Sequence, residues 1–215
     1  MIFVTRTAKP KVLIKNDTKW TKAIKAAKTK EQLKKAVEKY KHAEIKQSLL
    51  EMFHGKCGFC ESKITNVDFG DIEHFKPKSI FPELAVTWEN LLLSCKKCNG
   101  SSQKSDHWPG AREGGPLVNP CEENPDKFFE FVYDKKTRVS FVKPKNKRAK
   151  VSEQIYGLNK TSLLQDRSDF IRKLIVVAYN YKKSSEAREI IDEAVKDSGE
   201  YAAFARMVKK KFTNV

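Results

Sequence analysis

The chain has 215 residues, enough for one compact domain or for a small domain with extensions. Hydrophobic residues make up 40% and charged residues 33% of it, which is too apolar for a disordered chain and too charged for a membrane protein. No stretch approaches the about 18 consecutive apolar residues of a membrane span, and the N-terminus lacks the features of a secretory signal. We therefore expect a soluble, cytoplasmic protein with no membrane partner.

The formal net charge of +16 is unevenly distributed. Residues 1–50 carry 14 basic and 4 acidic side chains, whereas residues 51–120 carry 8 and 9. Residues 121–150 carry 9 and 5, and residues 151–215 carry 12 and 9. A near-neutral centre between basic flanks favours a polyanion held at the periphery around a site that can bind cations. Charge that serves only solubility is the alternative, because lysine-rich surfaces are common.

The N-terminal quarter is expected to be helical and basic. Residues 1–16 suggest an irregular or strand-like leader, followed by a short helix through Ala27 with Asp17 or Thr18 as its N-cap. Thr29 and Gln32 form a capping-box pattern that opens a second helix, in which Leu33, Val37 and Tyr40 share a face. A third helix over 42–54 would bury Ile45, Leu49, Met52 and Phe53 and end at Gly55.

Four of the five cysteines form two Cys-x-x-Cys pairs separated by 34 residues: Cys57, Cys60, Cys95 and Cys98. Two such turns can complete a tetrahedral four-sulfur zinc site. A reducing compartment disfavours disulfides, and a redox motif of the thioredoxin type would need a single pair near a βαβ pattern. We expect a structural zinc ion, and we expect Cys121 to be a small buried residue rather than a fifth ligand.

The segment between the cysteine pairs reads as a β-rich stretch over 64–75 that bends near Gly70, followed by a proline-containing loop. A short strand or turn precedes the second pair, and a helix is expected after it, up to Pro109 and Gly110.

Beyond a connection at 111–126, the alternating stretches 128–133 and 138–143 predict a β-hairpin. From Lys150 onward the pattern is helical, with a long helix from Thr161 to about Tyr181. The predicted regions are a basic helical arm (1–55), a cysteine-pinned core (56–110), a connector with a hairpin (111–149) and a helical C-terminal region (150–215).

Candidate catalytic residues lie between and beside the cysteine pairs. Glu73 and His74 end the β-rich stretch, Asn90 follows His74 by sixteen residues, and Asn99 follows Cys98 directly. A histidine can accept a proton from water near neutral pH, and carboxylate and amide oxygens suit Mg²⁺ or Mn²⁺. Each residue alone has an ordinary interpretation as a surface or turn residue. Together they predict metal-assisted hydrolysis of phosphodiesters.

The motifs CGFC, DIEHF and WENLLLSCKKCN, followed by Lys104, resemble the HNH endonucleases, which have a ββα-metal fold. The resemblance covers residues 57–104. It implies an α+β protein in which His74 is the general base, Glu73 and Asn99 hold the catalytic Mg²⁺ or Mn²⁺, Asn90 orients the loop and the base, and the four cysteines bind zinc. Most relatives carry Asp where Glu73 stands, so Asp71 is a competing metal ligand.

A wider resemblance takes in EHFKPKS, TWENL, PLVNPCEENP and YGLN and covers nearly the whole chain. These segments are similar to PtuB-type HNH nucleases of Septu and retron-linked antiphage operons. The resemblance implies an effector nuclease whose partner is an ABC-like ATPase of the PtuA type.

The nucleic-acid target is expected to be DNA, with RNA as the alternative. The candidate phosphate contacts are Lys22, Lys25, Lys28, Lys34, Lys35 and Lys104. Two other functions stay open at this point. The chain could be a non-catalytic zinc module that binds nucleic acid or protein, or an interaction subunit that docks on an ATPase.

Overall fold

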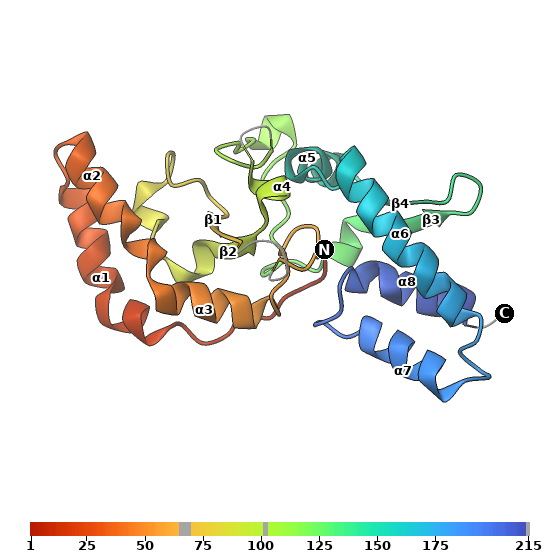
Figure 1. Cartoon of the computed structure of the whole chain (residues 1–215). Helices are drawn as coiled ribbons and strands as arrows, with labels where there is room; N and C mark the ends of the chain where they lie inside the picture. The colour runs from red at the N-terminus through yellow and green to blue at the C-terminus, as the bar shows by residue number, and fades with distance from the viewer. Residues whose placement is uncertain (65–69, 101–102, 214–215) are drawn as a thin grey trace.

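The computed structural model describes residues 1–64, 70–100 and 103–213. The molecule is elongated, with the N-terminal helices at one end, two small sheets further along and the C-terminal helices at the other end (Figure 1). The N-terminus itself lies near the middle of the molecule (Figure 1). This mixture of helices and small sheets confirms the α+β class.

The N-terminal arm consists of α1 (Lys11–Ala26), α2 (Lys30–Val37), the 3-10 helix η1 (Glu38–Lys41) and α3 (Ala43–Met52). The prediction of an irregular leader up to residue 16 is wrong, because α1 begins directly after Pro10. Leu13 is fully buried and anchors the first turn, and Asp17 pairs with Lys9 at 2.9 Å instead of capping a helix.

The predicted ends of the next two helices are confirmed in their main features. The Thr29 hydroxyl accepts a hydrogen bond from the N–H of Gln32 at 3.2 Å, although the Gln32 side chain accepts from the N–H of Lys28 rather than of Thr29. In α3 the predicted apolar face is buried, and Gly55 ends the segment with a φ of 65°.

The central sheet is an antiparallel pair, β1 (Asp71–His74) and β2 (Leu91–Ser94). Its register places Glu73 opposite Leu92 and His74 opposite Leu91. The first cysteine turn joins the same sheet, because the N–H of Gly58 donates to the Leu93 carbonyl at 2.9 Å. Part of the predicted β-rich stretch, residues 65–69, lies outside the described residues.

The helix predicted between the second cysteine pair and Pro109 is much shorter than expected. The structure contains α4 (Lys96–Asn99), and Gly100 then adopts an extended ψ of 161°, which ends the helix. Lys104 therefore lies in a turn beyond the helix and not on a helix face. Because α4 ends early, the Lys104 side chain does not point to solvent from a helix face.

The second half of the chain follows the sequence pattern closely. The predicted hairpin is present as β3 (Phe129–Asp134) and β4 (Val139–Pro144). Asn146 caps the next helix, which therefore starts three residues earlier than expected. The C-terminal helices are α5 (Lys147–Tyr156), α6 (Thr161–Ala178), α7 (Ser185–Ala194) and α8 (Ala202–Phe212).

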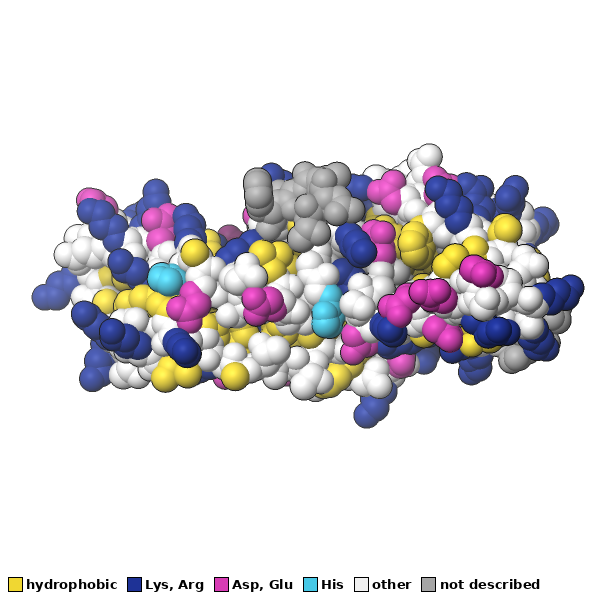
Figure 2. All heavy atoms as spheres, turned by 60° about the horizontal axis from the view of Figure 1, so that its bottom comes forward, with side chains coloured by type: hydrophobic (Ala, Val, Ile, Leu, Met, Phe, Trp, Pro, Cys, Tyr) yellow, Lys and Arg dark blue, Asp and Glu magenta, His cyan; other side chains and the backbone are white. Residues whose placement is uncertain are grey.

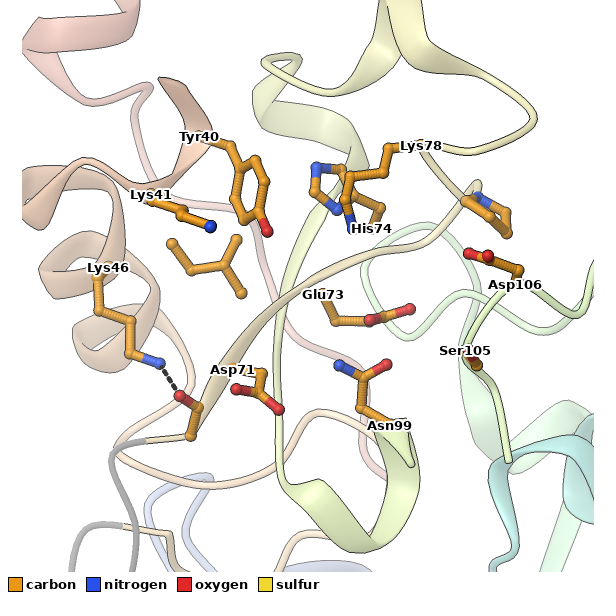
Figure 3. A pocket seen from close by; sticks show the side chains of 13 residues that line it. Tyr40, Lys41, Lys46, Asp71, Glu73, His74, Lys78, Asn99, Ser105 and Asp106 are labelled. Atoms are coloured by element: carbon orange, nitrogen blue, oxygen red, sulfur yellow. Dashed lines mark hydrogen bonds between the residues drawn. The ribbon is translucent and has the colours of Figure 1, made fainter. Parts of the chain in front are cut away.

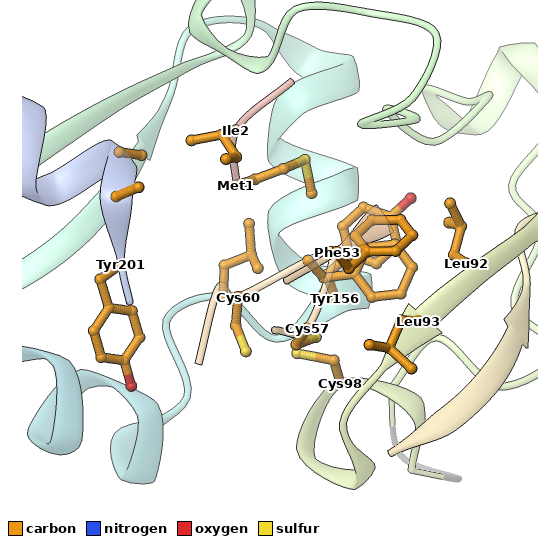
Figure 4. Close-up of a cluster of buried hydrophobic side chains, with 14 of the residues drawn as sticks. Met1, Ile2, Phe53, Cys57, Cys60, Leu92, Leu93, Cys98, Tyr156 and Tyr201 are labelled. Atoms are coloured by element: carbon orange, nitrogen blue, oxygen red, sulfur yellow. The ribbon is translucent and has the colours of Figure 1, made fainter. Parts of the chain in front are cut away.

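The C-terminal region packs back onto the first cysteine turn (Figure 4). The ring of Phe59 stacks on Tyr156 with centroids 4.1 Å apart, and the Ser62 hydroxyl donates to that of Tyr201 at 3.0 Å. The Glu61 carboxylate accepts from the N–H of Ala203 at 3.0 Å and pairs with the ammonium of Met1 at 2.7 Å. Segments from both ends of the chain thus meet at this turn.

None of the helices in the described ranges combines the length and the apolar character that crossing a bilayer requires.

Candidate functional site

The four cysteines of the two Cys-x-x-Cys pairs come together at the predicted place. Their sulfur atoms all lie within 4.8 Å of one another, and the Sγ atoms of Cys60 and Cys95 are 3.7 Å apart. A tetrahedral zinc ion with Zn–S bonds of about 2.3 Å requires sulfurs about 3.8 Å apart, so this donor set fits zinc. Within the described ranges it is the one group of three or more His, Cys, Asp or Glu residues with metal-site spacing.

The neighbouring thiols and burial also affect the charge of this cluster. Hydrogen bonds with the neighbouring thiols, first that of Cys57, and then burial hold the pKa of the Cys98 thiol well above its usual range. Only the thiolate binds zinc, so zinc binding at this cluster would release protons. Cys121 lies outside the cluster, and burial raises the pKa of its thiol to about 11, which makes it unreactive.

His74 is the last residue of β1, and its ring is buried. The ring Nε2 lies 3.0 Å from the carbonyl oxygen of Ala85. A carbonyl can only accept, so we assign the proton to Nε2, and Nδ1 keeps the free lone pair. Burial, aided by the positive charges of Lys78 and Lys104, lowers the pKa of His74 to about 4, although the bond to Ala85 acts in the opposite direction. The ring is therefore neutral at pH 7.

Glu73 precedes His74 in β1 and pairs with Lys104 inside the protein. The Lys104 ammonium donates to Glu73 Oε1 at 2.8 Å and to the His74 carbonyl at 2.7 Å, and its side chain is 0% exposed. Burial raises the pKa of Glu73 and lowers that of Lys104, while their mutual attraction acts against both shifts. The sequence placed Lys104 among the surface contacts to nucleic acid. The structure places it in the interior instead, where its ammonium meets the Glu73 carboxylate.

Asn90 is buried at the end of the 3-10 helix η3 (Trp88–Asn90), directly before β2, and does not line the pocket that contains His74. Its side chain accepts from the N–H of Lys76 at 2.8 Å and donates to the carbonyls of Lys76 and Leu84 at 3.0 and 3.2 Å. Leu84 directly precedes Ala85, whose carbonyl accepts from His74. Asn90 therefore fixes the loop whose Ala85 carbonyl accepts the hydrogen bond from His74.

Asp71, Glu73, His74 and Asn99 line one open pocket of about 500 Å³, and Figure 3 shows their side chains around it. Asp71 and Asn99 are half-buried. Sequence reasoning missed several other lining residues: Tyr40, Lys41 and Lys46 from the arm, Lys78 from the loop after β1, and Ser105 and Asp106 after α4. Two indications of these residues were present in the sequence: the position of Tyr40 on an apolar helix face, and Lys78 within the motif EHFKPKS.

The other five candidate lysines do not line this pocket. Lys22, Lys25, Lys28, Lys34 and Lys35 are exposed on or beside α1 and α2, and Lys35 pairs with Glu31 at 2.8 Å. Figure 2 shows Lys and Arg side chains at this end of the molecule and also at the opposite, C-terminal end. Their role in binding stays a prediction.

Comparison with known proteins gives two agreeing results. The HNH endonuclease family matches residues 57–105, the segment that contains the four cysteines and the pocket residues of β1 and α4. The Septu protein PtuB of Bacillus mycoides (strain KBAB4) is 31% identical over 239 aligned positions, which cover 91% of this chain and 80% of that protein. The chain belongs to the PtuB family.

A second relative, the Septu protein PtuB of Bacillus thuringiensis, is 33% identical over 135 positions. That match covers 61% of this chain and 46% of the relative. Membership of the PtuB family rests on the longer alignment, which includes the arm and the C-terminal helices as well as the HNH segment.

The sulfur cluster predicts about one zinc ion per chain, coupled to folding. We expect Cys57→Ser and Cys95→Ser to lose both the zinc and the soluble fold, because each removes one ligand of four. Cys121→Ser is the matched control and should retain both. Elemental analysis and thermal unfolding would measure these effects, and a well-folded Cys95→Ser protein without zinc would contradict the prediction.

The buried ion pair predicts a large effect of removing one partner only. Lys104→Met leaves the Glu73 carboxylate without its buried partner and should lower the free energy of unfolding by about 3–5 kcal/mol. The double variant Lys104→Met/Glu73→Gln should recover part of that loss.

Lys97 is the control for this measurement, because it pairs at 2.6 Å with Asp166 on the exposed surface. Lys97→Met should cost only about 0–1 kcal/mol. Urea unfolding with zinc present would compare the variants. Equal losses of unfolding free energy in Lys97→Met and Lys104→Met would show that the buried pair stabilises the fold no more than the exposed pair does.

Proposed function

We propose that the chain is a metal-dependent HNH endonuclease that hydrolyses phosphodiester bonds, with DNA as the favoured substrate and RNA as the alternative. One observation carries the proposal. His74 is buried and neutral, its Nε2 is engaged by Ala85, and it lines the same pocket as the oxygen ligands Asp71, Glu73 and Asn99.

In this proposal His74 is the general base. Nδ1 takes a proton from the attacking water while Nε2 stays bonded to Ala85, so the ring keeps its orientation as it becomes charged. Water oxygen then forms the new bond to phosphorus as the bond to the leaving oxygen breaks. Asn90 contributes by fixing the 76–84 loop, and it has no contact with the reacting atoms.

The pocket has the donor chemistry for a catalytic cation. Mg²⁺ and Mn²⁺ prefer carboxylate and amide oxygens and need only one or two carboxylates from the protein. Glu73 and Asn99 are the proposed ligands, and Asp71 is the competitor, because one oxygen of Glu73 is engaged by Lys104. When bound, the cation would neutralise charge on the phosphate and on the leaving oxygen.

We further propose that the chain acts in the cytoplasm as the nuclease effector of an antiphage system, together with an ABC-like ATPase of the PtuA type. Membership of the PtuB family supports this proposal. The extent of the chain outside the HNH segment agrees with it, since both the arm and the C-terminal helices lie beyond residues 57–105.

A second candidate is a non-catalytic zinc-stabilised module that binds nucleic acid or protein. The Glu73–Lys104 pair favours it, because a carboxylate already engaged by an ammonium is a weaker ligand for a catalytic cation. A cleavage assay separates the two functions.

For the nuclease we expect His74→Ala to retain zinc, fold and DNA binding and to lose cleavage by about 10² or more. EDTA should abolish cleavage, and high Mn²⁺ should partly rescue Glu73→Ala and Asn99→Ala but not His74→Ala. His54→Asn is the control, because His54 is exposed and its φ of 53° suits asparagine.

The assay should be run with and without the co-purified ATPase. Undiminished cleavage by clean His74→Ala would rule out the proposed base, and cleavage insensitive to EDTA would rule out the divalent cation.

Binding should depend on the exposed lysines of the arm. Replacing Lys22, Lys25, Lys28, Lys34 and Lys35 with Ala should weaken binding to all sequences and flatten its salt dependence, by about 0.9 in the log–log slope for each lost contact with duplex DNA. The control removes the same charge from exposed lysines elsewhere: Lys136, Lys150, Lys182, Lys183 and Lys210. Equal slopes for the two five-fold variants would show that the arm has another purpose, such as partner docking.

The partner proposal predicts a stable complex. Co-expressed with an ATPase encoded beside it, the chain should elute with that ATPase after nuclease treatment, which removes any bridging nucleic acid. Separate elution would contradict the proposal.

A further inference from the structure

Tyr40 belongs to the N-terminal arm, outside the segment that matches the HNH family, yet it touches the proposed general base. Its ring centroid lies 4.5 Å from that of His74, with the two planes at 84°, an edge-to-face contact. Figure 3 shows the two rings side by side at the rim of the pocket. The contact joins the 3-10 helix η1 to the end of β1.

The ring of His74 needs more than one contact to hold a single orientation. Rotation about χ2 of histidine is broad, so the hydrogen bond from Nε2 to Ala85 fixes one atom but leaves the ring able to tilt. A ring that tilts away from this carbonyl loses the bond and can carry its proton on either nitrogen. Tyr40 packs against the ring from the arm, while the Ala85 carbonyl binds it from the loop. These two contacts come from different elements, so together they restrict the tilt.

Tyr40 is itself held in place. It is half-buried and packs on the hydrophobic core, and η1 lies between α2 and α3 in the chain and contacts both. The ammonium of Lys78 lies 5.5 Å from the centroid of the Tyr40 ring, at cation–π distance. Lys78 comes from the loop after β1, so this contact also ties the arm to the core beside His74.

We propose that Tyr40 is a positioning residue for His74: its ring holds the imidazole so that Nδ1 faces the pocket. The inference rests on the proposed nuclease function and deepens it, since it makes the arm a wall of the active site. The aromatic ring of Tyr40 makes the contact that orients His74, so the Tyr40 hydroxyl is not required.

The test compares Tyr40→Ala, Tyr40→Leu and Tyr40→Phe, with Leu33→Ala as the control. Leu33 packs partly buried in α2 and does not line the pocket, so its loss disturbs the arm without touching His74. Single-turnover cleavage of a DNA duplex at saturating protein measures the chemical step, and a titration measures affinity separately. Zinc content and thermal unfolding report whether each variant is folded.

We expect Tyr40→Ala to slow the single-turnover rate by about 10-fold or more with affinity nearly unchanged, because small misplacements of a reacting group are costly. Tyr40→Phe should cleave at the wild-type rate, and Tyr40→Leu should fall between them. Leu33→Ala should retain the wild-type rate. A Tyr40→Ala rate equal to wild type, an effect confined to affinity, or equal losses in Tyr40→Phe and Tyr40→Ala would each overturn the proposal.

A second readout does not depend on cleavage. In zinc-loaded protein with ¹⁵N-labelled histidine, the ring nitrogens of His74, assigned by their loss in His74→Ala, should show one tautomer in wild type and in Tyr40→Phe. In Tyr40→Ala the same signals should be averaged between the two tautomers. If Tyr40→Ala is unfolded, this averaging should appear in Tyr40→Leu. Unchanged His74 signals in both smaller variants would overturn the proposal. If His74→Ala still cleaves, the nuclease mechanism fails, and the tautomer measurement continues to test the Tyr40 contact by itself.

Discussion

The sulfur cluster is the constraint on which the centre of this protein depends. The sheet that carries Glu73 and His74 has two strands of four residues each, and a two-stranded sheet of that size is marginal on its own. Cys95 follows β2 directly, and the first cysteine turn donates from Gly58 to the carbonyl of Leu93 in the same strand. A zinc ion on the four sulfurs would therefore fix the end of the sheet.

The first cysteine turn also contacts the C-terminal half of the chain. Phe59 stacks on Tyr156 of α5, Glu61 accepts from the backbone at the start of α8, and Ser62 bonds to Tyr201. The C-terminal helices thus pack on the turn that carries Cys57 and Cys60. Loss of the zinc should for this reason disturb both the sheet and the packing of the C-terminal half.

On the pocket side, polar groups in a low-dielectric interior determine what the side chains can do. Lys104 neutralises Glu73 and binds the carbonyl of His74, so an ion pair and a backbone contact share one buried ammonium. Burial keeps His74 neutral, and Ala85 engages one of its nitrogens. The outer wall of the pocket, with Tyr40, Lys41 and Lys46, belongs to the arm. An HNH segment isolated from its arm would lack this wall.

The sequence by itself determined the features that short-range patterns encode. The spacing of two Cys-x-x-Cys pairs was enough to predict the sulfur cluster, the capping pattern at Thr29 was enough to predict the start of α2, and alternation was enough to predict the hairpin at 129–144. The order of Glu73, His74 and Asn99 predicted which residues meet in one pocket. Only the tertiary structure decided that α4 stops at Asn99, that Lys104 turns inward to Glu73 and that Tyr40 meets His74. Those contacts join residues about thirty positions apart, and their geometry comes from the packing of whole elements, which no local periodicity or ligand spacing records.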